Sequence, residues 1–145
     1  MQTVSYDEDY HAWARQNAEL IRQGRLSEVD VEHVAEELDN MGKSQKRELV
    51  SRLSVLLAHL LKWQYQPDRR SGSWVGTIVT QRAEIVLLLD ESPSLMHDIH
   101  ASIGKGYKIA RERAAGETGI PANAFPESCP YTLDEMVTEE FRTAE

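Results

Sequence analysis

The sequence predicts an all-α fold: an up-and-down bundle of five main helices with a C-terminal strap and a short terminal helix. Apolar residues recur at intervals of three and four through residues 49–67, which places them on one broad face of a helix. No segment alternates polar and apolar residues with the period of two that a strand requires. The stretch 49–67 is apolar over most of its circumference, as is typical of a helix in the middle of a bundle.

The first two helices are predicted from residues that start and stop helices. Ser5 and Glu8 have the spacing of a capping box, so the first helix is expected to begin at Ser5 and to end at Gly24. Ser27, followed by several acidic residues, predicts a second helix that ends at Gly42. Because both linkers are very short, successive helices are expected to pack antiparallel.

Three further main helices follow. Residues 44–66 and 73–90 are predicted to form the third and fourth helices, which are joined by a proline-containing turn. A serine before Pro93 predicts the start of the fifth helix, since proline is well tolerated at the first helical position. In this helix Gly104 and Gly106 either weaken the structure or allow a close approach of another helix.

The C-terminal part differs in composition from the bundle. Residues 118–145 contain prolines and a few apolar residues without helical periodicity at their start, and we interpret them as a strap that lies on the bundle. Thr132 and Glu135 have the spacing of a second capping box, which predicts a short helix over residues 133–137.

Length and composition predict one domain over residues 1–145, located in the cytoplasm. A chain of 145 residues can bury a sizeable core without staples. Its single cysteine, Cys129, rules out an internal disulfide and a metal site built from several cysteines. The sequence has no leader peptide or membrane-spanning segment, so we expect no membrane association.

The charges are unevenly distributed along the chain. Residues 43–82 hold eight basic and two acidic residues, a net charge of +6, which leaves −14 for the rest of a chain whose net charge is −8. We interpret the basic segment as neutralising acidic neighbours. Nucleic-acid binding is the less favoured interpretation, because an acidic protein repels phosphates at long range.

Metal and cofactor chemistry find little support. A di-iron bundle requires Glu-x-x-His motifs, and the chain contains none. His97 and His100 have the spacing of two ligands on one helix, but zinc needs further partners from elsewhere. We therefore predict no metal and no cofactor.

The turn before the fourth helix is a candidate anion site. Arg69, Arg70 and Ser73 cluster where the helix N-terminus could bind a carboxylate or a phosphate. A solvated turn with a serine cap has the same sequence features and is the favoured interpretation.

A buried polar cluster is the sharper candidate. The second, third and fourth helices each carry polar residues beside an apolar seam, and these are Glu36 or Glu37, then His59 and Lys62, then Gln81 or Arg82. Buried charges must be paired, so we expect these residues to meet. They form either a network that fixes helix register or a site in which Glu36 or Glu37 and His59 perform acid–base catalysis beside Arg82.

The sequence resembles a bacterial family catalogued as domain of unknown function twenty-nine. The resemblance rests on the string HLLKWQYQP at residues 59–67 and extends over nearly the whole chain, through Tyr6, Trp13, Glu36-Glu37, Met41-Gly42, Arg69, Ser73-Trp74, Gln81-Arg82, Phe125-Pro126 and Cys129-Pro130-Tyr131. It implies a helical fold and no particular activity. Many of these residues are polar or aromatic, which favours a shared polar surface near the third and fourth helices.

Three functions are compatible with these features. The leading hypothesis is a cytoplasmic binding module that forms homo-oligomers through the hairpin of the third and fourth helices. The alternative is a small enzyme whose candidate catalytic residues are Glu36, Glu37, His59 and Arg82, with Lys62, Arg69, Arg70, Ser73 and Gln81 as candidate ligand-binding residues. Nucleic-acid binding through the basic hairpin is the weakest of the three.

Overall fold

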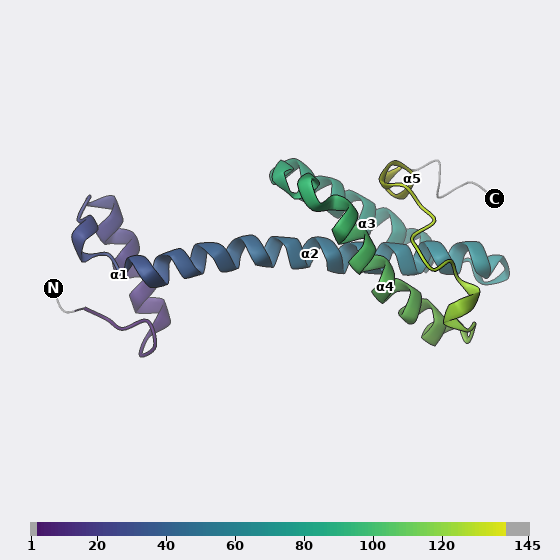
Figure 1. Ribbon diagram of the computed structural model, residues 1–145, viewed down its shortest axis with the longest axis horizontal. Helices are drawn as coiled ribbons and strands as arrows, with labels where there is room; N and C mark the ends of the chain where they lie inside the picture. Colours follow the sequence, from purple (N-terminus) through teal and green to yellow (C-terminus); the bar gives the residue numbers. More distant parts are fainter. Residues whose placement is uncertain (1–2, 139–145) are drawn as a thin grey trace. The chain divides into compact units, whose positions relative to one another are not determined.

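The computed structural model describes residues 3–138, and all regular secondary structure in that range is helical (Figure 1). This confirms the predicted all-α class. The α-helices are α1 (Tyr10–Arg22), α2 (Val31–Tyr65), α3 (Gly72–Glu91), α4 (Ile99–Thr118) and α5 (Leu133–Val137). Short 3-10 segments precede or connect them, at Leu26–Glu28, Pro67–Arg69, Pro93–Asp98 and Ala122–Ala124.

The chain divides into two compact units, residues 1–44 and 45–145. The first unit contains α1 and the beginning of α2. The second contains the rest of α2 together with α3, α4 and α5. That residues 1–145 behave as one domain stays a prediction.

Helix α2 corrects the expected break at Gly42. The predicted second and third helices are one continuous helix of 35 residues. Among the described residues, positive φ angles are confined to Gly24 and Gly119, so Gly42 keeps a helical backbone. A glycine inside a helix costs about 1 kcal/mol relative to alanine, which is too little to end a helix of this length without a proline or a left-handed residue.

The starts of the first two helices also differ from the prediction. Helix α1 begins at Tyr10, because Asp9 accepts a hydrogen bond from the backbone N–H of Ala12 (3.0 Å) and so caps the helix in place of Ser5. Helix α2 begins at Val31, where Asp30 accepts from the N–H of His33 (3.4 Å). In both helices the aspartate directly before the first helical residue provides the cap, in place of the serine that the sequence suggested.

The expected end of α1 and the expected start of α3 agree closely with the structure. Helix α1 stops just before Gly24, whose φ of +71° is the left-handed conformation that glycine adopts readily. Helix α3 is capped by Ser71, which accepts from the N–H of Trp74 (3.3 Å). Pro93 starts a 3-10 segment rather than the predicted α-helix, and α4 follows at Ile99.

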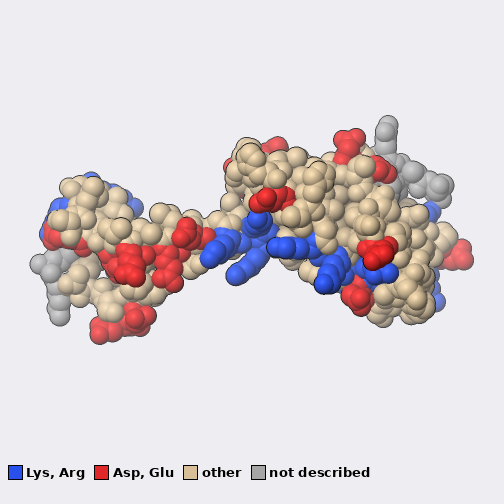
Figure 2. All heavy atoms as spheres, viewed as in Figure 1, with Lys and Arg blue, Asp and Glu red and all other residues tan. Residues whose placement is uncertain are grey.

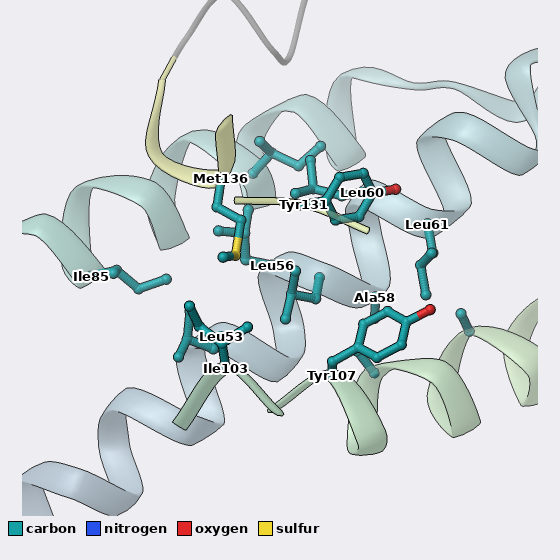
Figure 3. Close-up of a cluster of buried hydrophobic side chains, with 14 of the residues drawn as sticks. Leu53, Leu56, Ala58, Leu60, Leu61, Ile85, Ile103, Tyr107, Tyr131 and Met136 are labelled. Carbon is teal, nitrogen blue, oxygen red and sulfur yellow. The ribbon is translucent and has the colours of Figure 1, made fainter. Parts of the chain in front are cut away.

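The core of the second unit is built on the apolar side of α2 (Figure 3). Five leucines of this helix, Leu49, Leu53, Leu56, Leu57 and Leu61, are completely buried. They pack with residues of α3, α4 and the strap, including Ile78, Ile85, Ile103, Tyr107, Tyr131 and Met136. The densest apolar stretch of the sequence is therefore the centre of the core, as predicted.

Gly106 allows α4 to approach α2 closely. A Cβ atom built on Gly106 would lie 3.0 Å from Cβ of Leu53 and 3.3 Å from the backbone of Val50 and Ser54. Gly104 has nothing within 4 Å of such an atom. Gly106 therefore allows the close approach of another helix, which is one of the two roles that the sequence left open, and Gly104 does not.

The strap lies on the second unit as far as the structure describes it. Helix α5 begins with the predicted capping box, in which Thr132 and Glu135 satisfy each other's backbone N–H groups. Helix α5 packs on α3, and its Met136 is completely buried. Residues 139–145 of the predicted strap lie outside the described residues.

Candidate functional site

Lys62 is the centre of a polar group between the last turns of α2 and α4. Its side chain is buried, and its Nζ donates to Oε2 of Glu117 (3.0 Å). The other carboxylate oxygen of Glu117 accepts from Nε of Arg113 (3.0 Å). Nζ of Lys62 also lies 5.3 Å from the ring centroid of Trp74, a cation–π distance. The buried ammonium is thus stabilised from two sides.

His59 belongs to the same group. Its Nδ1 lies 2.8 Å from the carbonyl oxygen of Val55, and because a carbonyl can only accept, Nδ1 carries the proton. Burial lowers the pKa of the imidazole below its usual value, and the positive charges of Lys62 and Arg113 lower it further. The hydrogen bond to Val55 and the charge of Glu117 oppose this shift. A neutral ring with Nδ1–H leaves Nε2 unprotonated, so this atom can accept a proton.

Arg82 is held by the strap. It is buried, its Nε donates to the carbonyl oxygen of Met136 (2.6 Å), and an Nη donates to that of Glu135 (3.4 Å). These contacts join α3 to α5. Gln81, beside it in sequence, accepts from Arg52 (3.3 Å) on α2.

The turn between α2 and α3 is also tied to α2. Arg70 donates from Nε to the carbonyl oxygen of Trp63 (2.9 Å), and its guanidinium carbon lies 4.6 Å from the centroid of the Trp63 ring. Arg69 and Ser73 are exposed. Figure 2 shows Lys and Arg side chains gathered on one face of the 45–145 unit.

A separate cluster of aromatic and acidic residues lies in the 1–44 unit. One carboxylate oxygen of Glu37 accepts from the hydroxyl of Tyr10 (2.7 Å), and the other accepts from the hydroxyl of Tyr6. The hydrogen bond to Glu37 is the main reason that the pKa of Tyr6 is raised to about 12, and the same bond lowers the pKa of Glu37.

Asp30 organises the other side of this cluster. Its Oδ2 accepts from the indole N–H of Trp13 (2.9 Å) and lies 2.8 Å from Nδ1 of His33. These bonds lower the pKa of Asp30, and the bond to Asp30 raises the pKa of His33. The His33 ring stacks on Tyr6 with 4.3 Å between centroids. Aromatic and carboxylate groups therefore satisfy one another around the junction of α1 and α2.

A cavity of about 400 Å³ lies between α4 and the strap. Tyr107, Arg111, Glu127 and Cys129 are among its lining residues. Burial raises the pKa of the Cys129 thiol, which makes it a poor nucleophile and supports its interpretation as a packing residue. None of the residues that the sequence predicted as site candidates is among those that line this cavity.

Comparison with known protein families identifies the family to which the chain belongs. The sequence model of the family described as "Domain of unknown function DUF29" matches residues 5–142, nearly the whole chain. The chain belongs to the DUF29 family. This confirms the resemblance seen in the sequence, and the family's description assigns no activity. No curated protein and no solved structure matches the chain.

In this DUF29 chain the polar candidates of the sequence analysis have partners other than those predicted. His59 and Lys62 do share one group, but the carboxylate and guanidinium beside them come from Glu117 and Arg113 of α4. Arg82 is buried as expected but binds backbone carbonyls. Glu37 is bound by two tyrosines and Glu36 is exposed, so neither is the carboxylate beside His59 that one of them was expected to be.

Several residues that build these groups were missed because their signals are weak. Arg113 and Glu117 are four apart, a spacing that indicates a surface ion pair and gives no hint of Lys62. Asn17 shares the helical spacing of Trp13 and Leu20 and so gives no local signal of its role, in which its Oδ1 accepts from the N–H of Asp30 (2.7 Å) and its Nδ2 donates to the carbonyl oxygen of Trp13 (3.0 Å). Only the folded chain reveals which carboxylate meets which cation.

Two further findings concern metal binding and membrane-spanning helices. No group of three His, Cys, Asp or Glu side chains in residues 3–138 is arranged to hold a metal ion. Within the same range, no helix has the length and apolar character needed to cross a membrane.

Proposed function

We propose that this DUF29 protein is an interaction module that associates with further copies of itself and acts by binding rather than by catalysis. The outward face of α3, in the hairpin that the sequence analysis favoured, supports this proposal. Val79, Val86 and Leu87 on this face are 46%, 41% and 51% exposed. Contiguous exposed apolar surface on a protein of this size is typical of interaction sites.

The face is continuous along the helix. Residues 76, 79, 80, 83, 86 and 87 recur at helical spacing and are all exposed, while Ile78, Ile85 and Leu88 on the opposite side enter the core. The outward residues are glycine, valine, threonine, alanine, valine and leucine, and no charge interrupts them before Asp90. A helix that is apolar on both sides is normally covered on both sides.

A second copy fits this face in an antiparallel arrangement. With Ala83 opposite itself, Val79 of one copy lies opposite Leu87 of the other, and the small side chain of Ala83 permits close approach. The acidic end of α3, at Asp90 and Glu91, then lies near the positively polarised N-terminus of the neighbouring α3. The same patch on both subunits satisfies two-fold symmetry.

The test is the mass of the protein in solution by light scattering. We expect the wild type to self-associate, and the double variant V79E/L87E to associate at least tenfold more weakly, because two carboxylates would be buried at the interface. Ile109→Glu is the matched control, since Ile109 is an isolated apolar residue on α4 that is 50% exposed. A wild type that stays monomeric at high concentration, or a V79E/L87E variant that associates like the wild type, would contradict the proposal.

A second candidate, acid–base catalysis, is supported by the group around His59. The ring is neutral at ordinary pH and its Nε2 makes no hydrogen bond to any described residue, while Lys62 and Glu117 lie in the same group. A base of this kind would use Glu117 in place of the predicted Glu36 or Glu37. The titration of His59, given below, tests the protonation state on which this candidate depends.

A further inference from the structure

The cavity of about 400 Å³ between α4 and the strap has the size of a small-molecule site. Helix α4 lines it with residues 104, 107, 108, 111 and 112, whose spacing of three and four places them on one face of the helix. The strap lines it with residues 127–129. All of these residues belong to the 45–145 unit, so the cavity lies within one compact body.

Hydrogen bonds fix the strap on α4 directly before the residues that line the cavity. The hydroxyl of Tyr107 donates to the carbonyl oxygen of Pro126 (2.5 Å), and an Nη of Arg111 donates to that of Phe125 (3.4 Å). The side chain of Phe125 is buried in the core. The two walls of the cavity are therefore held in place by the fold itself, as is usual for ligand sites.

Arg111 is a cation with few partners in the wall of this cavity. The long bond to Phe125 is its sole hydrogen bond to a described residue, although a guanidinium has five N–H donors. Its Nε is buried and has no hydrogen-bond partner among residues 3–138. A buried donor without an acceptor costs free energy. An acceptor that enters the cavity would recover this cost.

Gly104 leaves room beside α4 at the same place. A Cβ atom built on this residue would meet nothing within 4 Å, and the residue is among those that line the cavity. A glycine inside a helix costs about 1 kcal/mol relative to alanine. In return, the helix has no side chain where a ligand could lie against it.

We propose that this cavity binds the carboxylate of a small organic acid, with Arg111 as the residue that holds the anion. A small rotation at the end of the Arg111 side chain would let Nε and an Nη donate to the two oxygens of one carboxylate, the strongest geometry for this pair. Lys108 adds a second positive charge, and the hydroxyl of Ser128 adds a donor. The ring of Tyr107 and the bare backbone at Gly104 offer contact to the apolar part of the acid.

The charges around the cavity favour a single negative charge on the ligand. Glu112 and Glu127 also line it, and neither forms an ion pair with a residue that the structure describes. They balance the charges of Lys108 and Arg111, so a doubly charged phosphate would meet more repulsion than a monocarboxylate. This inference goes beyond the proposed function, because the cavity uses α4 and the strap rather than the outward face of α3.

The test is an NMR titration of the ¹⁵N-labelled protein with benzoate, which joins one carboxylate to an apolar ring. We expect saturable shifts of the Nε–H signal of Arg111 and of backbone amides in residues 104–112 and 127–129. Benzamide has a similar shape without the charge, and inorganic phosphate has the charge without the ring. Each should bind at least about tenfold more weakly than benzoate, a difference of about 1.4 kcal/mol or more.

Two variants locate the site. Arg111→Gln removes the cation, and Gly104→Leu fills the cavity without touching the bond between Arg111 and Phe125, so each should weaken benzoate binding at least about tenfold. Gly104→Leu meets no neighbour at its Cβ, and thermal unfolding should show a folded protein. Lys105→Gln is the matched control, because Lys105 is an exposed cation of α4 that is not among the lining residues, and it should bind benzoate as the wild type does.

Three results would overturn the proposal. The first is the absence of saturable shifts with benzoate. The second is binding of benzamide or phosphate as tight as that of benzoate, which would show that a single carboxylate is not what the cavity recognises. The third is unchanged benzoate binding by folded Gly104→Leu or Arg111→Gln protein, which would place the benzoate elsewhere on the molecule.

Discussion

Arg82 brings a full positive charge into the core of the second unit, and its partners include main-chain atoms of the strap. A buried charge is tolerated only where hydrogen bonds replace its hydration, and the carbonyls of Met136 and Glu135 provide them. The side chain therefore acts as a clasp between α3 and α5. The sequence suggested Arg82 as a candidate catalytic residue, and the structure places it in a contact between α3 and α5.

Replacing Arg82 with methionine should loosen this clasp. The carbonyl of Met136 would lose its charged donor, and we expect the free energy of unfolding to fall by about 2 kcal/mol. Urea denaturation followed by circular dichroism measures this change, and hydrogen exchange should increase first in residues 132–137. Arg69→Met, at an exposed position in the turn before α3, is the control and should change stability little. Equal stability of the two variants would contradict the clasp.

The His59 ring should titrate below the usual histidine range, because burial and two cations disfavour its charged form. Lys62→Met removes one of the two cations and leaves Glu117 paired with Arg113 alone, so the pKa of His59 should rise. Lys108→Met, at an exposed position of α4, should leave it unchanged. An NMR titration of the ring carbons reports both values.

Because the pKa of His59 is lower in the folded state than in the unfolded one, the stability that this residue contributes falls as the pH drops below about 6.5.

At the scale of helices, Gly104 and Gly106 have opposite roles although they lie two residues apart. Gly106→Ala should destabilise the protein by about 1–3 kcal/mol, because the new methyl group meets Leu53 and the backbone of α2 at 3.0–3.3 Å. Gly104→Ala meets nothing within 4 Å and should raise stability by up to about 1 kcal/mol through helix propensity. Thermal unfolding of the two variants should therefore shift in opposite directions, and shifts of the same sign would contradict the close approach.

Helix positions were predictable where periodicity and caps agreed. The buried side of α2, the limits of α3 and the capping box of α5 follow from local sequence alone. Gly42 was misjudged because a glycine at a helix end and a glycine inside a helix look alike in sequence. The difference lies in its φ angle, which depends on the residues around it rather than on glycine itself.

At the scale of the whole molecule, the polar contacts were the least predictable part. Lys62 was correctly expected to be buried and paired, but Glu117 is 55 residues away and no local pattern connects them. The same holds for Arg82 and the strap, which are 54 residues apart. Apolar residues are interchangeable partners in a core, whereas a charge requires one particular acceptor that only the packed chain defines. The polar residues that resemble the family's signature can be recognised in the sequence, but the sequence does not show which residues they pair with.

The distance in sequence between Arg82 and Met136 has a consequence for the order in which the protein matures during synthesis. The 1–44 unit contains the partners of its own aromatic and acidic residues, so these contacts need no later part of the chain. The 45–145 unit cannot complete its core until Tyr131 and Met136 have emerged. Until then Arg82 lacks the carbonyls that hold it, and the apolar surfaces of α2 and α3 that these residues cover stay open to other nascent chains.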